Sequence, residues 1–166
     1  MKAHLQAKLL AVLLLAGCNG RPTAVLPPGA ENARISMEAR SNGFKLTASA
    51  GFFKFINRKD QRVVYHASPE LIFTPSGQVA AAADNSLALD PSLVVSSPQK
   101  STVLVCPDGI VTIRGESGKQ TKIGRLLLSW FDHPDKLKSA ENGFLEATPE
   151  AGEPLSFAPV SDGQCG

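Results

Sequence analysis

The sequence predicts a mainly β protein, with one small sandwich-like or barrel-like β domain that follows an N-terminal helix. Short apolar runs alternate with polar residues at the two-residue period of half-buried strands. Clusters of Gly, Pro, Asn, Asp and Ser separate these runs, as expected for turns between strands. After residue 18, no segment carries apolar residues at the 3.6-residue period of an amphipathic helix. These features indicate a domain built from short strands and turns.

Turn signals place the ends of the expected strands. Asn42-Gly43 is a strong hairpin pair. The clearest hairpin centres on Pro107-Asp108-Gly109, because Pro presets φ near about −65° and Gly accepts a positive φ. The expected strands are 34–38, 44–47, 51–56, 62–66, 71–74, 78–81, 101–106, 110–114 and 121–131, the last being the longest, and 135–139 is expected to form one helical turn.

The first 18 residues have the pattern of a targeting segment. Lys2 and Lys8 precede the apolar run 9–17, and a charged start with a short apolar core is typical of a secretory signal. The run is shorter than the roughly 20 residues that span a bilayer as a helix. It ends in Leu-Ala-Gly before Cys18, which resembles the lipobox of bacterial lipoproteins. We therefore expect a lipoprotein signal peptide over 1–17; an ordinary secretory signal with a chance cysteine is the alternative.

The lipobox resemblance implies a lipid anchor. The chain would be exported, cleaved before Cys18 and acylated on that thiol, with palmitate among the acyl chains that hold it in the membrane. Asn19 follows, rather than the Asp that retains enteric lipoproteins at the inner membrane, which favours the outer membrane, facing the periplasm. Residues 18–30 are rich in Pro and Gly and are expected to form a lipidated tether. The β domain is then expected over 31–166.

Two further cysteines, Cys106 and Cys165, remain once Cys18 is acylated. An even pair in an exported chain indicates a disulfide. The chain-entropy model gives about 4 kcal/mol of stabilisation for a loop of this length. Two unpaired thiols are the alternative. A metal site is not expected at these cysteines, because the chain has no C-x-x-C pair.

Composition argues against two kinds of ligand. The formal net charge is +2 and no basic cluster is present, so no nucleic-acid partner is expected. The segment 115–120, GESGKQ, superficially resembles a phosphate-binding loop, but Ile113 stands where the first Gly is required and Gln120 where Ser or Thr is required. We expect a polar hairpin turn there, and no cofactor or small-molecule substrate.

The histidines offer no active site by sequence. His66 lies near Ser68, and His133 lies between Asp132 and Asp135. A Ser/His/Asp hydrolase needs its nucleophile on a sharp turn with a base converging on it, and the chain has no G-x-S-x-G elbow. Neither histidine has paired metal-ligand spacing. We therefore expect no catalytic and no metal-binding residue, and a small envelope hydrolase is a remote third class.

Four aromatic residues could be read either as core or as a contact surface. Phe52, Phe53, Trp130 and Phe131 lie in expected strands whose other apolar residues require burial. Exposed aromatics often anchor interfaces, but this setting favours the core.

Several segments carry a likeness to a known family. These are GFF at 51–53, IF at 72–73, GQV at 77–79, DGIV at 108–111, IGRLLLSWF at 123–131, the Pro and Leu at 134 and 137, and ENGFLEAT at 141–148. Over about 51–152, and most specifically over 103–152, the chain resembles the middle domain shared by the distal-rod and hook proteins, the axial proteins of the bacterial flagellum. The resemblance implies the β fold of that domain.

The chain also departs from this family. The family's Tyr-Thr-Arg-Asp-Gly segment corresponds here to YHASP at 65–69. The two terminal helices that pair in the axial tube have no counterpart, since a lipid signal stands at the start and the sequence stops near Gly166. We therefore do not expect the chain to polymerise as a rod subunit. A disulfide from Cys106 to the tail would, by hypothesis, secure the end that a helix secures in the family.

The resemblance implies a non-enzymatic function. We expect a lipid-anchored structural or assembly component of the flagellar basal body, whose domain contacts rod, hook or ring proteins. The alternative is an envelope-anchored binding module of the same fold that is unrelated to flagella, because fold likeness alone does not transmit function. The sequence identifies neither the contact surface nor the oligomeric state.

Overall fold

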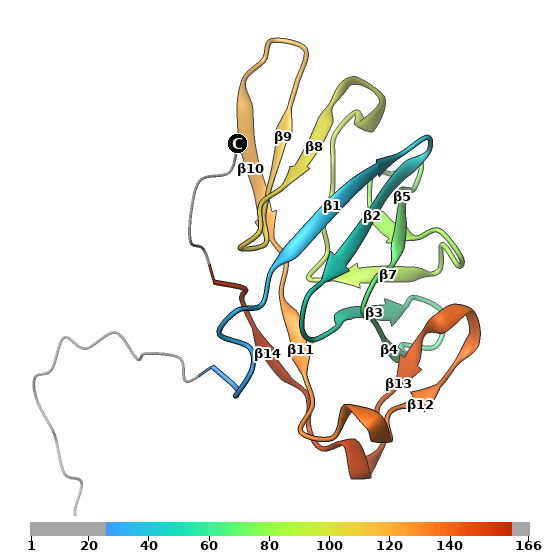
Figure 1. Ribbon diagram of the computed structural model, residues 1–166. Coiled ribbons are helices and arrows are strands. Elements are labelled where there is room, and N and C mark those ends of the chain that lie inside the picture. The colour runs from blue at the N-terminus through green and yellow to red at the C-terminus, as the bar shows by residue number, and fades with distance from the viewer. Residues whose placement is uncertain (1–25, 161–166) are drawn as a thin grey trace, which may run out of the picture.

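The computed structural model describes residues 26–160 and confirms a mainly β fold (Figure 1). Among these residues, no helix has the length and apolar character needed to cross a bilayer. The elements are β1 (Ile35–Arg40), β2 (Gly43–Ala48), β3 (Phe53–Asn57), β4 (Val63–His66), β5 (Glu70–Phe73), β6 (Val79–Ala81), β7 (Leu87–Asp90), η1 (Pro98–Lys100), β8 (Thr102–Val105), β9 (Ile110–Arg114), β10 (Gln120–Arg125), β11 (Leu128–Trp130), η2 (Pro134–Lys136), β12 (Lys138–Ser139), η3 (Glu141–Gly143), β13 (Leu145–Glu146), η4 (Pro149–Ala151) and β14 (Leu155–Phe157).

The strands form three open antiparallel sheets. The largest has the order β1-β2-β5-β6-β7-β3-β4-β13-β12, the second has the order β10-β9-β8, and β11 pairs with β14 in the third. The expected hairpin at 107–109 is confirmed, since β8 and β9 pair from Thr102↔Arg114 to Val105↔Val111. Its turn is joined to the largest sheet, because the amide of Ile35 donates to the carbonyl of Pro107 over 3.0 Å.

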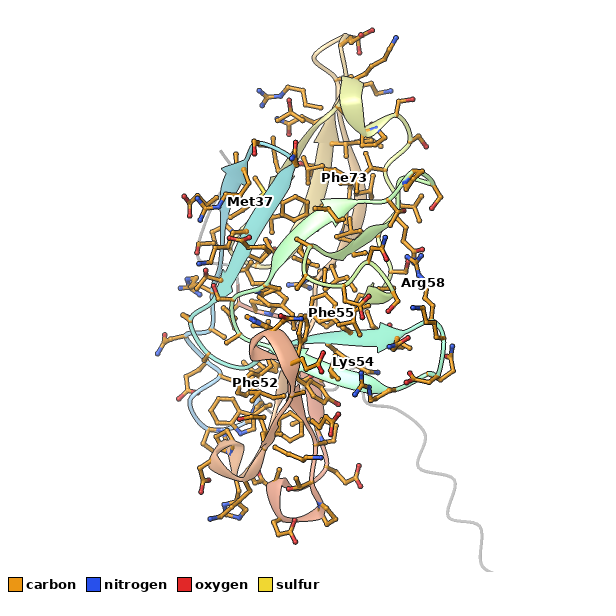
Figure 2. The ribbon with its side chains drawn as sticks, turned by 90° about the vertical axis from the view of Figure 1, so that its right-hand side faces the viewer. Met37, Phe52, Lys54, Phe55, Arg58 and Phe73 are labelled. Atoms are coloured by element: carbon orange, nitrogen blue, oxygen red, sulfur yellow. The ribbon has the colours of Figure 1, made fainter. Side chains whose placement is uncertain are left out.

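One apolar core lies between the two larger sheets. Phe44, Phe53 and Phe55 enter it from the nine-stranded sheet, while Val111 of β9 and Leu126 beyond β10 enter it from the other side. Figure 2 shows Phe73, Phe55 and Phe52 at successive positions along the length of the domain. Neither sheet could bury its own apolar face alone, so the sheets depend on each other for stability.

A second, smaller cluster fills the end of the domain near η2 and η4. Phe131 meets Tyr65 edge to face at a centroid distance of 4.9 Å, and Phe52 packs on Phe131 at 6.1 Å. The expected burial is confirmed for Phe53 and Phe131, whereas Phe52 and Trp130 are only partly buried against the clusters.

The expected strand over 121–131 is wrong as a single strand. The chain leaves the three-stranded sheet after Arg125 and enters the sheet with β14 at Leu128. Leu126 marks the break, since its side chain is buried and its amide donates to the carbonyl of Gly109 over 2.8 Å. Both halves are apolar, so composition alone could not reveal that they belong to different sheets.

The expected hairpin pair Asn42-Gly43 is displaced by one residue. Arg40 pairs with Gly43, so the turn consists of Ser41 and Asn42, and neither has a positive φ. Gly43 opens β2 instead, and a Cβ there would overlap the carbonyl oxygen of Leu71 in β5. A close approach of two backbones, rather than turn geometry, explains this glycine.

The packed domain begins earlier than the expected boundary at residue 31. Ala30 is fully buried, and its amide donates to the carbonyl of Pro27 over 3.0 Å. A Cβ on Gly29 would lie 3.1 Å from Cη2 of Trp130, so the backbone at Gly29 lies directly against the indole ring. Residues 26–30, expected as the end of the tether, are therefore part of the fold.

Two arginines hold the last described residues against the domain. A guanidinium nitrogen of Arg34 donates to the carbonyl of Val160 over 2.9 Å. Arg125 donates to the carbonyl of Pro159 over 3.1 Å and, through Nε, to that of Asp108 over 3.1 Å. The segment after β14 is thus fixed beside the start of β1 and the end of β10.

Gly43 provides a test of the contact between β2 and β5. We expect Gly43→Ala to destabilise the protein by about 1–3 kcal/mol, because the added methyl group forces two hydrogen-bonded backbones apart. Gly115→Ala is the matched control, since its Cβ meets nothing within 4 Å and should change stability by less than about 0.5 kcal/mol. Urea unfolding of both variants measures the difference, and equal stabilities would contradict the assignment.

Candidate functional site

The segment from β12 to β13, residues 138–146, forms an arm at one edge of the largest sheet. A cavity of about 410 Å³ lies where this β12–β13 arm meets the other strands of the sheet. Lys45 and Glu70 face it from the paired strands β2 and β5, and His66 reaches it from the end of β4. Asn142 and Phe144 close it from η3 and the residue that follows. The cavity therefore combines a cation, a carboxylate, an imidazole and an aromatic ring.

His66 and Ser68 are neighbours in this cavity, but not as a catalytic pair. The backbone amide of Ser68 donates to Nδ1 of His66 over 2.9 Å. The hydroxyl of Ser68 instead shares a 2.9 Å hydrogen bond with Thr47. A serine nucleophile requires its hydroxyl to donate to the imidazole, and here a backbone amide occupies the Nδ1 lone pair. The arrangement suits a structural role for the imidazole.

The surroundings of His66 favour its neutral form. Burial lowers the pKa of the imidazole below its ordinary value of 6.5, and the positive charge of Lys45 acts in the same direction. A hydrogen bond to the backbone of Asn142 opposes this shift without reversing it. Nδ1 of the neutral imidazole can accept the hydrogen bond from the Ser68 amide, whereas a doubly protonated ring has no free lone pair to do so.

The loop around Asn142 positions Phe144. Asn142 has φ 56° and ψ 31°, and Gly143 follows with φ 76°, so two successive residues adopt left-handed backbone. This reversal directs Phe144 into the core, edge to face with Phe55 at 5.3 Å and with His66 at 4.9 Å. Asn and Gly are the residues that tolerate this conformation best.

A second cavity, of about 230 Å³, lies on the other side of Asn142 and Phe144. Arg62 and Lys138 line it together with Glu146, which bonds both: 3.1 Å to Arg62 and 3.5 Å to Lys138. The Arg62 pair joins the β12–β13 arm to the residue before β4, whereas the Lys138 pair lies within the arm, between β12 and β13. The backbone of the arm pairs with β4 at one register position, Leu145↔Tyr65. In this cavity Arg62, Lys138 and Glu146 are engaged with one another.

The other residues singled out by sequence lie elsewhere. Cys106 is buried and disulfide-bonded, while Cys18 and Cys165 lie outside the described residues, so the pairing of Cys106 with Cys165 stays a prediction. His133 is exposed before η2, and Asp132 and Asp135 beside it are exposed. Within residues 26–160, no three His, Cys, Asp or Glu side chains come together as a metal site would require.

The segment 115–120 forms the polar hairpin turn expected between β9 and β10. The amide of Gly118 donates to the carbonyl of Gly115 over 2.9 Å, which closes the turn. Lys119 and Gln120 are exposed at its end. The P-loop likeness therefore has no counterpart in the backbone, because a phosphate-binding loop leads from a strand into a helix.

Sequence reasoning missed that Lys45, Glu70 and Asn142 line one cavity with His66. Lys45 and Glu70 are adjacent only because β2 pairs with β5, which local patterns do not reveal. The Asn-Gly pair at 142–143, followed by an aromatic residue, is the one local signal that could have drawn attention to this loop.

Comparison with protein-family models and with curated proteins finds no match for this chain.

The depressed pKa of His66 predicts a pH-dependent contribution to stability. The unfolded chain takes up the His66 proton more readily than the folded one, so this contribution is complete above pH 6.5 and is lost as pH falls through the folded pKa. We expect wild type to lose more unfolding free energy between neutral and mildly acidic pH than His66→Asn. Urea unfolding at several pH values measures this loss.

The exposed His133 supplies the matched control for that experiment. His133→Asn should retain the wild-type loss of stability on acidification. A titration of the His66 imidazole by NMR with a midpoint above 6.5 would contradict the assignment, as would identical pH profiles for wild type and His66→Asn.

Proposed function

We propose that the protein is a non-enzymatic, lipid-anchored structural or assembly component of the flagellar basal body, with its β domain contacting axial or ring proteins. The observation that carries this proposal is the segment 123–148, which resembles the corresponding block of the distal-rod and hook proteins. The structure assigns a role in the fold to the residues that make up this likeness.

The apolar positions of the segment are core residues. Leu126, Leu128, Phe131 and Phe144 are all buried, in the main cluster or in the smaller one. Gly124 lies where a Cβ would meet the side chain of Leu93 at 2.6 Å, so a larger residue would require the buried Leu93 side chain to shift. The large apolar residues and the glycine of this segment thus stand where the packing of this fold requires them.

The polar positions of the segment form its turns. Asn142 adopts the left-handed conformation that directs Phe144 inward. Thr148 accepts a hydrogen bond from the amide of Ala151 over 3.2 Å, and its hydroxyl donates to the carbonyl of Lys136 over 2.8 Å. These contacts connect η2 to η4. Because the resemblance to the axial proteins lies in core and turn residues, it supports a β domain with the same architecture as theirs. An axial or assembly protein would use such a domain as a structural unit.

The geometry at His66 supports a non-enzymatic reading in the same way. The imidazole is bonded to a backbone amide and packed against Phe144, and the hydroxyl of Ser68 is engaged with Thr47. The two hydrogen bonds fix the turn after β4, and the ring contact holds the β12–β13 arm against it. The side chains that could have been read as a nucleophile and base are therefore used to build the fold.

The lipid anchor is tested at Cys18. We expect Cys18→Ser to lose the mass of the acyl chains and to move the protein from the membrane fraction to the soluble envelope fraction, because Cys18 is the cysteine that follows the lipobox-like segment. Asn19→Ser is the matched control and should stay lipidated and membrane-bound. A Cys18→Ser protein that remains in the membrane fraction through detergent-sensitive attachment would contradict the anchor at this residue.

Partner identity is tested by crosslinking in cells. A photoreactive residue is placed in turn at the exposed positions Val94, Lys119 and Lys136. These positions lie in the loop after β7, in the β9–β10 turn and in η2, so they sample three separate parts of the surface. Mass spectrometry after membrane solubilisation should identify rod, hook or ring proteins as the crosslinked partners. In a separate experiment, deletion of the gene should impair basal-body assembly and swimming. Normal swimming together with capture of unrelated envelope proteins would favour an anchored binding module of the same fold instead.

A further inference from the structure

We propose that the edge of the domain formed by β11 and β14 rests on the surface of the bilayer that holds the lipid anchor, with Leu155 entering the interfacial region. This inference rests on the proposed acylation of Cys18 and adds an orientation and a second contact to it. Three observations carry it: where the chain joins the domain, how far the tether reaches, and what the adjoining edge presents.

The chain joins the domain at β11. The backbone of Gly29 lies against the ring of Trp130, and Ala30 is fully buried beside it. In Figure 1 the first described residues, drawn in blue, run next to β14 and β11. Because these residues are packed, any tether from Cys18 ends at or before Leu26, at this edge.

The tether is too short to let the opposite end of the domain face the membrane. Eight peptide steps separate Cys18 from Leu26, and at about 3.6 Å each they span at most roughly 29 Å. A globular domain of this size is about 35 Å across. If the far end faced the lipid, the β11–β14 edge would stand farther from the surface than the tether reaches. The tether therefore keeps this edge within about 29 Å of the headgroups, on the membrane-facing half of the domain.

The edge presents apolar groups at that point. Leu155 is 49% exposed, the second most exposed of the large hydrophobic side chains among residues 26–160. It pairs across the strands with Trp130, which is half-buried. Trp and aliphatic side chains at the boundary between protein and water are the groups that partition into the headgroup region.

Electrostatics does not draw this edge to lipid. The exposed charges nearest to it in the chain are of both signs, with Arg125 before β11, Asp132 after β11 and Glu153 before β14. The contact therefore depends on apolar insertion and suits zwitterionic lipid. One leucine is a weak membrane anchor in isolation, and it becomes effective here because the acyl chains keep the edge at high local concentration near the surface.

Trp130 is the single tryptophan of the chain and reports on this contact directly. The full lipidated protein is reconstituted into phosphatidylcholine vesicles, either plain or brominated on the acyl chains close to the headgroup. Bromine quenches indole only at short range, so we expect a loss of Trp130 emission in brominated vesicles relative to plain ones. Leu155→Asp should abolish that loss, because a carboxylate does not enter the interface.

Val94→Asp is the matched control, since Val94 is 56% exposed and lies beside Gln78 near β6 rather than at the β11–β14 edge. It should retain the wild-type quenching. The inference is overturned if the acylated protein shows equal emission in plain and brominated vesicles, or if Leu155→Asp is quenched like wild type. Equal emission would mean that the edge faces away from the lipid, and wild-type quenching of Leu155→Asp would mean that Leu155 does not make the contact; both would leave the lipid anchor intact. Absence of acyl mass on Cys18 would remove the anchor and the inference together.

Discussion

The domain depends on one apolar core that two open sheets share. Phe53 and Phe55 of β3 are fully buried at the centre of the larger sheet, and Val111 and Leu126 close over the core from the side of the smaller one. An open sheet of short strands has little stability until one face is covered. The connections between the sheets, such as the bond from Ile35 to Pro107, are therefore as important to the fold as the strand pairs themselves.

The β12–β13 arm connects this core to the segment on which the proposed function rests. The arm pairs with the main sheet at one register position, so its placement depends on side chains. Phe144 enters the core between Phe55 and His66, while Glu146 bonds Arg62 and Lys138 at the surface. The segment that most resembles the axial proteins is thus fixed at both its apolar and its charged positions. This arrangement agrees with the proposed function, in which the surface of the domain contacts partner proteins and no side chain reacts with a substrate.

Local chemistry was sufficient to predict much of this fold. Pro107-Asp108-Gly109 and the segment 115–118 form the turns expected from their residue types, and the flanking strands begin and end within one or two residues of the expected positions.

The predictions that failed have a common cause, which is that contacts between residues distant in sequence determine the structure there. The strand over 121–131 divides because Leu126 bonds Gly109, and Gly43 is required by the approach of β5. The strand β7 was not expected, since its Ala-rich approach carries no alternation and only its pairing with β3 and β6 orders it. The site followed the same rule: His66 and Ser68 could be named from sequence, but their roles depend on Thr47 and Phe144.

The hydrogen bond from Arg34 to the carbonyl of Val160 has a consequence for the history of such a domain. It places the last described residue beside Arg34, just before β1, so the chain enters the first strand and leaves the last one at neighbouring points. A unit with adjoining ends can be inserted into a longer chain, or removed from one, without unfolding, because the flanking segments need only meet at one point. Under the proposed function, the same β domain would sit between two helices that pair with each other in an axial protein and would hang from a single lipid here. Nothing in its interior has to change between these settings.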